Sequence, residues 1–394
     1  MDTDFIIVGG GIGGAVVGGL LASGGKKVIV LEKSTAPPNW VRPEVLWPAT
    51  AQVLFSLLPR ENLERDAMLP LRGVRATRRG QAVISIDSEL LNQIQVQPWT
   101  TNPNRTREQL LAGGLFELRR GMEVVAVLKQ NERIIGVKAR DGRDGSVRDV
   151  TAQFTIGDDG VHSLVRAACG IEIDTKVFPL DFLCFEFQWP GSLPAAVGRV
   201  WLNPDSASGF VAMLALPLPQ NKGAGLVAAS PDVFEGKRKV SAPEGWERFR
   251  SSEPEITEVL CGRDFRTDLV RVRRPWGHAR RYGAQGAFIM GDAAHPVSPA
   301  GGQGANMSVA DACALADIFL QGSEDPLAAY ERRRRPANER SLLFTRRADL
   351  ILGLPNWLLP ASLLLRGARW AGCHPSLLRR FVKFASTAFL ESPV

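Results

Sequence analysis

A glycine run near the start of the chain has the spacing of a site for a dinucleotide. Residues 5–8 form a short apolar segment that leads directly into Gly9, Gly11 and Gly14, the three glycines of a G-x-G-x-x-G pattern. The first glycine permits a tight turn, the second lets the backbone approach a pyrophosphate, and the third lets a helix pack close to a strand. The start of that helix offers unpaired N–H groups and partial positive charge to the pyrophosphate.

An acidic residue lies where the partner of a bound ribose would be needed. The pattern predicts a helix over 15–23, closed by glycines, and a second strand over 27–32 that ends at Glu32. A carboxylate there would accept hydrogen bonds from a ribose 2′-hydroxyl and would repel a 2′-phosphate. The strand, helix, strand and terminal acid predict dinucleotide binding, and at this point NAD and FAD both remain open.

A second glycine-rich block favours FAD. A strand predicted over 286–290 is followed by Gly291 and Asp292, and the turn 299–306 then opens a helix predicted over 307–320. A strand-terminal aspartate is suited to hydrogen-bond a polyol chain, and the turn lets backbone N–H groups reach a planar ring. The positive end of the helix would stabilise the negative charge that a reduced flavin carries at N1.

A third connection from strand to helix spans 156–166 and holds Asp159, Gly160 and, near the helix cap, Ser163. By itself it is a plain β-turn-α connection.

The remaining chain predicts an α/β protein. Segments 74–96 and 178–229 alternate like antiparallel strands, while 106–115 reads as a helix and 123–137 as a hairpin. The simplest architecture is a nucleotide-binding lobe interrupted by a largely antiparallel sheet.

The three motifs, in this order and spacing, resemble those of the class A flavoprotein aromatic hydroxylases, the para-hydroxybenzoate hydroxylase superfamily. The resemblance covers most of residues 1–330. It implies a Rossmann-like FAD-binding domain of the glutathione-reductase type, an inserted, mainly antiparallel substrate domain and a C-terminal helical segment. We expect the FAD-binding parts at 1–72, 103–176 and 268–345, the substrate parts at 73–102 and 177–267, and the helical segment at 346–394.

The resemblance also implies roles for single residues. Asp292 would bind the ribityl chain, Glu32 the adenosine ribose and Arg42 the pyrophosphate, with Pro43 holding Arg42 extended. Asp159 is similar to an aspartate that serves both FAD and NAD(P)H. The residues implied to contact FAD are Gly9, Gly11, Ile12, Gly13, Gly14, Glu32, Lys33, Arg42, Arg107, Asp159, Gly160, Gly291, Asp292, Pro299, Gly302, Gln303, Gly304, Ala305 and Asn306.

In this family NADH or NADPH transiently reduces the flavin, oxygen adds at C4a, and the hydroperoxide delivers one oxygen atom to an aromatic ring. We therefore expect a monooxygenase of secondary metabolism acting on a hydrophobic aromatic, quinone-like or quinolone-like compound with O2. Three alternatives stay open: a flavin-dependent halogenase, disfavoured because the chain has no W-x-W-x-I motif, a prenyl reductase, and a non-catalytic flavin-bound module.

The sequence offers fewer candidates for catalytic and substrate-binding residues than for residues that contact FAD. His295, near the flavin in sequence, is the best-placed base, although a structural role is an equal alternative; Pro299 should lie against the flavin ring. Only Tyr282 and Tyr330 could form a tyrosine relay, and both lie outside the predicted substrate domain. The pocket is expected to be lined by Phe182, Phe185, Phe187, Trp201, Phe210 and Met213.

The net charge of +7 is concentrated at the C-terminus, where residues 332–394 hold twelve Lys/Arg and three Asp/Glu. This distribution argues against a nucleic-acid enzyme. The leucine-rich segment 350–365 is short for a bilayer span, so it is interpreted either as a lid or as a peripheral membrane contact. The five scattered cysteines predict reduced thiols and no metal. We expect a cytoplasmic monomer or homodimer, with peripheral membrane association as the alternative.

Overall fold

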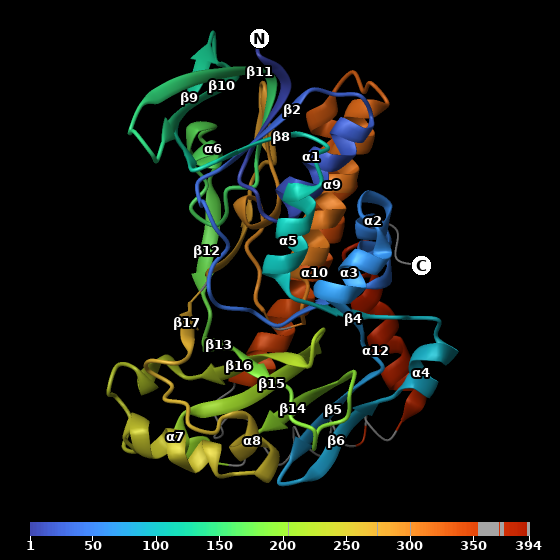
Figure 1. Cartoon of the computed structure of the whole chain (residues 1–394), viewed down its shortest axis with the longest axis vertical. Coiled ribbons are helices and arrows are strands. Elements are labelled where there is room, and N and C mark those ends of the chain that lie inside the picture. Colours follow the sequence, from blue (N-terminus) through green and yellow to red (C-terminus); the bar gives the residue numbers. More distant parts are fainter. Residues whose placement is uncertain (204, 274, 300, 354–369, 371–373, 392–394) are drawn as a thin grey trace.

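A parallel sheet forms the centre of the first lobe (Figure 1). The computed structural model describes residues 1–203, 205–273, 275–299, 301–353, 370 and 374–391. The sheet order is β19-β20-β11-β1-β2-β8, parallel except for β19. Its strands are β1 (Thr3–Val8), β2 (Val28–Glu32), β8 (Glu117–Arg120), β11 (Val147–Gly157), β19 (Gly283–Ala284) and β20 (Ala287–Ile289).

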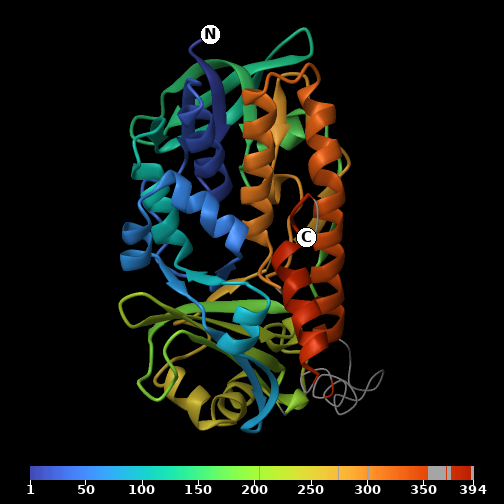
Figure 2. The same ribbon diagram turned by 90° about the vertical axis from the view of Figure 1, so that its right-hand side faces the viewer.

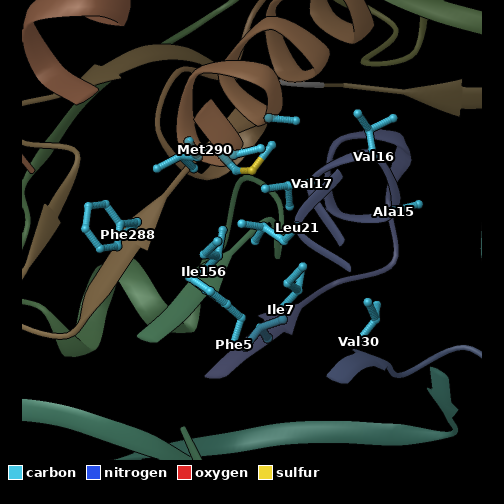
Figure 3. Close-up of a cluster of buried hydrophobic side chains, with 14 of the residues drawn as sticks. Phe5, Ile7, Ala15, Val16, Val17, Leu21, Val30, Ile156, Phe288 and Met290 are labelled. Carbon is cyan, nitrogen blue, oxygen red and sulfur yellow. The ribbon is translucent and has the colours of Figure 1, made fainter. Parts of the chain in front are cut away.

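Helices pack on the central sheet because its strands are apolar on both faces. They are α1 (Ile12–Ser23), α5 (Pro103–Ala112), α9 (Gly304–Leu320) and α10 (Pro326–Gly353). Figure 3 shows Phe5 and Ile7 of β1, Val17 and Leu21 of α1 and Met290 in one core. Helices α1 and α9 touch at Gly13, where an added Cβ would lie 2.0 Å from Ser308 Oγ.

A hairpin extends the sheet beyond β11, as the alternation of 123–137 predicts. It consists of β9 (Met122–Gln130) and β10 (Arg133–Asp141), and β10 pairs antiparallel with β11. The helix α6 (Leu164–Ala168) follows β11 directly. A two-stranded ribbon, β12 (Ile173–Val177) with β18 (Pro275–Ala279), then connects the two lobes, as Figure 1 shows.

The second lobe is a mainly antiparallel sheet of order β17-β13-β16-β15-β14-β5-β6, in which only the described pair β14–β5 is parallel. Its strands are β5 (Gly73–Arg78), β6 (Gln81–Ile86), β13 (Asp181–Gln188), β14 (Val197–Leu202), β15 (Phe210–Leu218), β16 (Lys222–Ala229) and β17 (Val270–Val272). Helices α7 (Ala242–Arg250) and α8 (Pro254–Val259) cover the face that points away from the first lobe (Figure 1).

Short elements fill the space between the two sheets. Strands β3 (Glu44–Leu46), β7 (Trp99–Thr101) and β4 (Met68–Pro70) form a small sheet, flanked by α2 (Pro48–Leu57) and α3 (Arg60–Asp66). The strand-like prediction for 74–96 is wrong beyond Ile86, because α4 (Ser88–Gln93) begins there. Asp87 caps that helix by accepting a hydrogen bond from the Leu90 N–H at 2.9 Å.

The C-terminal helix α12 (Pro375–Thr387) lies beside α10 (Figure 2). The interpretation of 350–365 as a lid or membrane contact falls almost entirely outside the described residues. Among the described helices, none is both long enough and apolar enough to cross a bilayer.

Candidate active site

Two cavities adjoin between the lobes. The first, here called the glycine-lined cavity, has a volume of about 260 Å³, and the second, the apolar cavity, about 400 Å³. Pro43, Pro299 and Gly302 line both of them. Among the predicted cofactor residues, those that line the first cavity are Gly11, Ile12, Gly13, Arg42, Gly160, Asp292, Pro299, Gly302, Gln303, Gly304 and Ala305.

The N-terminal ends of two helices face the glycine-lined cavity. Helix α1 begins after Gly11 and α9 after Gln303, and neither cap residue accepts a hydrogen bond through its side chain. Both helix starts therefore present N–H groups and partial positive charge to the same cavity. Such an arrangement can bind a phosphate at one end and an electron-rich ring at the other.

The backbone at the head of α1 requires glycine for two different reasons. Gly9 has a φ of +102°, and a Cβ there would lie 2.3 Å from the carbonyl oxygen of Asp158. A Cβ on Gly14 would lie 2.2 Å from the carbonyl oxygen of Gly9. The first glycine thus permits the turn and the third permits the close approach of helix and strand, as the sequence predicted. Neither residue lines the cavity itself.

The two adjacent aspartates after β11 have different roles. The Asp159 carboxylate accepts hydrogen bonds from the N–H groups of Leu164 and Val165 at 2.7 and 3.1 Å, so it caps α6. It is Asp158, which the sequence analysis left out, that lines the cavity and accepts a hydrogen bond from the Gly14 N–H at 2.7 Å. Burial raises the pKa of Asp158 well above its ordinary value. The structure therefore contradicts the expectation that the Asp159 side chain faces the cofactor site, because Asp158 lines the cavity instead.

Glu32 and Arg107 meet beyond the head of α1. Glu32 accepts hydrogen bonds from the N–H groups of Gly10 and Ser34 at 2.9 and 2.7 Å, and its Oε2 lies 3.4 Å from Arg107 Nη2. The Nε and Nη2 atoms of Arg107 are buried without a hydrogen-bond partner. A buried guanidinium with spare donors fits a polar or anionic ligand group. Lys33, by contrast, is exposed.

Arg42 and Asp292 both line the glycine-lined cavity. The Nε of Arg42 donates to Glu44 Oε1 at 2.8 Å, and the negative charge of Glu44 raises the pKa of Arg42. Asp292 lies in the turn Gly291–Ala293 that follows β20. With the two helix starts and Arg107, these residues fit FAD: Arg42 and α1 would hold its pyrophosphate, Asp292 its ribityl chain, and the turn before α9 its ring.

The turn before α9 is held in place by hydrogen bonds from two side chains, those of Gln303 and Asn306. Asn306, which lines neither cavity, donates to the carbonyl oxygens of Val45 and Gly302 at 2.9 and 2.8 Å. Gln303 donates to the carbonyl oxygen of Ala385 in α12 at 2.9 Å. These two side chains position the turn, and Gln303 also lines the glycine-lined cavity; contact of either residue with FAD stays a prediction.

The structure contradicts the assignment of His295 as a catalytic base. The ring is 1% exposed and lines neither cavity. Its Nε2 lies 2.5 Å from the Oδ2 of Asp311, whose Oδ1 accepts from Arg334 Nε at 2.8 Å and from Asn338 Nδ2 at 3.1 Å. Burial opposes ionisation, but His295 and Arg334 together hold the pKa of Asp311 below its ordinary value. His295 belongs to a buried polar cluster, the structural alternative.

Four of the six predicted pocket residues lie on the wrong face of the sheet. Phe182 lines the apolar cavity, and Met213 contributes to its wall while also packing in the core behind it. Side chains of a strand alternate between the two faces, so the odd-numbered neighbours of Phe182 point away. The residues buried in that second core against α7 and α8 are Phe185, Phe187, Trp201 and Phe210.

The lining of the apolar cavity comes from elements far apart in the sequence. The residues that surround it include Trp47, Leu71 and Val74 from the first hundred positions, and Phe344, Phe381, Val382 and Ala385 from α10 and α12. None of the residues that the structure describes in this lining carries an ionisable side chain. The C-terminal residues matched no motif, so only the amphipathic pattern of α12 could have indicated that they face inward.

Comparison with known proteins agrees with this geometry. A family model described as the FAD binding domain matches residues 2–345. The 6-methylpretetramide 4-monooxygenase of Streptomyces rimosus is 29% identical over 86% of this chain and 82% of its own length. An uncharacterised aromatic compound monooxygenase, YhjG of Bacillus subtilis, is 32% identical over 57% of this chain, but the match spans only 44% of that relative.

A solved structure shows the same fold. The p-nitrophenol 4-monooxygenase PnpA from Pseudomonas putida superimposes with a TM-score of 0.80, covering 98% of each chain at 18% identity. The inserted antiparallel sheet and the parallel sheet of the first lobe are thus one shared architecture.

Replacing Arg107 tests its part in the cofactor site. We expect Arg107→Gln to weaken FAD binding about 10- to 100-fold, the effect of losing a charged hydrogen bond. Arg105→Gln is the matched control, since Arg105 on the same helix donates to Asp66 O and Gln220 Oε1, away from the cavity. Fluorescence titration of the apoprotein with FAD measures both. Equal affinities for the two variants would contradict the assignment.

A histidine beside the buried polar cluster predicts a dependence of stability on pH. The Nε2 of His278 lies 2.6 Å from the Tyr282 hydroxyl, which accepts a hydrogen bond from Asn338 Nδ2 at 3.2 Å. Burial lowers the pKa of His278 to about 4, from an ordinary value of 6.5. Between these values the unfolded chain binds a proton that the folded chain does not, so the free energy of unfolding should fall as the pH falls, by at most about 1.4 kcal/mol per pH unit. Urea unfolding from pH 7 to 4 should show a shallower slope in His278→Gln than in the wild type. The exposed His162→Gln is the control and should leave the slope unchanged.

Proposed function

The chain belongs to the FAD binding domain family and is a flavoprotein monooxygenase of the aromatic hydroxylase type. From this premise we propose that it uses NAD(P)H and O2 to hydroxylate an apolar aromatic compound, quinone-like or quinolone-like, in the apolar cavity. One observation carries the proposal: the glycine-lined cavity and the apolar cavity share Pro43, Pro299 and Gly302. A ring held by the turn before α9 would therefore face both a cofactor site and a substrate site.

The protein itself positions the cofactor and keeps water away from the reacting position. FAD, when bound, supplies the reduction and oxygen chemistry. The helix starts of α1 and α9 hold the cofactor at its charged parts, while the apolar cavity excludes water from the position next to Pro299. At about 400 Å³, this cavity is of the size that small-molecule sites have.

The composition of the cavity narrows the substrate class. Val45, Leu214, Leu226 and other aliphatic side chains surround it, and its described lining offers no side chain that could take a proton from a phenol. A compound whose ring is electron-rich without deprotonation fits such a lining. A charged substrate would lose its hydration there without a counter-charge.

Flavin reduction tests the proposed reaction directly. We expect NADH or NADPH to bleach the bound flavin in an anaerobic stopped-flow experiment, and an apolar aromatic ligand from a panel of phenols, quinones and alkylquinolones to accelerate it. Admission of oxygen should then yield one hydroxylated product per reductant consumed, identified by mass spectrometry. Failure of both nicotinamides to reduce the flavin with every ligand would overturn the proposal.

Two phenylalanines of β13 allow the apolar cavity to be tested separately from the core behind it, because Phe182 lines the cavity and Phe185 packs in the core. With a substrate identified, Phe182→Ala should raise KM about 10- to 100-fold, because about 1.5–3 kcal/mol of apolar contact is lost. Phe185→Ala, three residues on, should leave KM unchanged while lowering the free energy of unfolding by about 3–5 kcal/mol, since its ring packs in the second core. Steady-state kinetics and urea unfolding on both variants check the pair; a KM effect in Phe185→Ala alone would contradict the placement.

A further inference from the structure

Helix α12 exposes basic side chains on its outward face and two aromatic side chains beside them. Leu378, Val382 and Ala385 point inward and are buried. Beside this buried side, Phe381 and Phe384 are 52% and 42% exposed. Large apolar side chains left exposed on a surface helix mark an interaction site.

The exposed apolar surface continues onto α10. The ring of Phe344 contacts the rings of Phe381 and Phe384, with centroids 5.9 and 5.5 Å apart, and Leu343 is 47% exposed. Figure 2 shows the two helices side by side along one flank of the molecule. We call this surface the basic-aromatic face; its exposed residues are Leu343, Arg346, Arg347, Arg379, Arg380, Phe381, Lys383 and Phe384.

The sequence of this part of the chain is mainly basic. Residues 340–390 contain eight Lys/Arg and a single acid, Asp349. Five of the eight lie on the basic-aromatic face. Such a surface attracts an anionic partner. It disfavours a second copy of this chain on the same face, because the two copies would bring like charges together.

The same helix forms a wall of the apolar cavity. Phe381, Val382 and Ala385 line that cavity, and Phe381 is also half exposed at the surface. One side chain thus lies between the solvent-facing surface and the predicted substrate site. An apolar compound dissolved in lipid would meet this part of the protein first.

We propose that the basic-aromatic face docks on an anionic lipid bilayer, with α12 lying along the interface. Phe381, Phe384 and Leu343 would enter the headgroup region, and the five cations would lie at the level of the acidic headgroups. Aromatic side chains flanked by Arg and Lys are the combination that interfacial helices use. The docking does not depend on the proposed reaction and can be measured without turnover.

Vesicle sedimentation tests the proposal on the full chain with FAD bound. The protein should sediment with vesicles of phosphatidylcholine mixed with phosphatidylglycerol and should stay in solution with phosphatidylcholine alone. Added salt should weaken the binding, because it screens the charges. No sedimentation with the anionic vesicles at low salt would overturn the proposal.

Two sets of variants assign the binding to this face. The triple change Arg379→Glu, Arg380→Glu and Lys383→Glu should weaken vesicle binding at least about 100-fold, since each lost cation accounts for about fivefold. Phe384→Ser should weaken it about tenfold or more through lost apolar burial. Retained binding by the triple variant would overturn the proposal.

The matched control makes the same change in net charge elsewhere. The triple change Lys27→Glu, Arg79→Glu and Lys239→Glu alters exposed residues away from α10 and α12 and should largely keep the binding. An equal loss in both triple variants would reduce the effect to net charge and contradict the proposal. Analytical ultracentrifugation without lipid tests the alternative that a second copy of this chain occupies the face. A dimer that the α12 variants dissociate would assign the face to self-association instead.

Discussion

The close contact between the head of α1 and the ends of β1 and β11 is the constraint on which the rest of the site depends. A side chain on Gly9 or Gly14 would collide with backbone atoms 2.3 and 2.2 Å away. With glycine at both places, the helix start lies directly at the carboxyl edge of the sheet. The same edge carries Asp158 and Asp292, and both line the glycine-lined cavity.

A second constraint, a buried polar cluster, holds α9, α10 and the turn after β20 together. Asp311 of α9 is fully buried and binds His295, Arg334, Asn338 and the N–H of Gly291. Removing one partner from such a buried ionic cluster leaves an uncompensated charge, which is strongly destabilising. The cluster therefore holds α9, α10 and the turn after β20 in one arrangement. Through Gln303 and Ala385, α12 is joined to that arrangement as well.

The second sheet divides two tasks between its faces. Residues such as Phe182, Val200 and Leu214 face the apolar cavity, whereas Trp201 and Phe249 build the core under α7 and α8. Core packing and the lining of the apolar cavity are thus divided between the two faces of the same strands. The C-terminal helices close the cavity from the side, which ties the proposed lipid-facing surface to the proposed substrate site without any shared catalytic residue.

The sequence by itself determined which residues gather at the glycine-lined cavity, because glycine spacing and strand-terminal acids are local patterns: Gly11, Arg42, Asp292 and Pro299, predicted as parts of one site, all line it. Tertiary structure decided what depends on orientation. Only the fold shows that Asp158 rather than Asp159 faces the glycine-lined cavity, that His295 turns toward Asp311, and that Phe182 but not Phe185 lines the apolar cavity. Adjacent residues differ in direction rather than in type, and direction is set by the sheet and helices that pack around them.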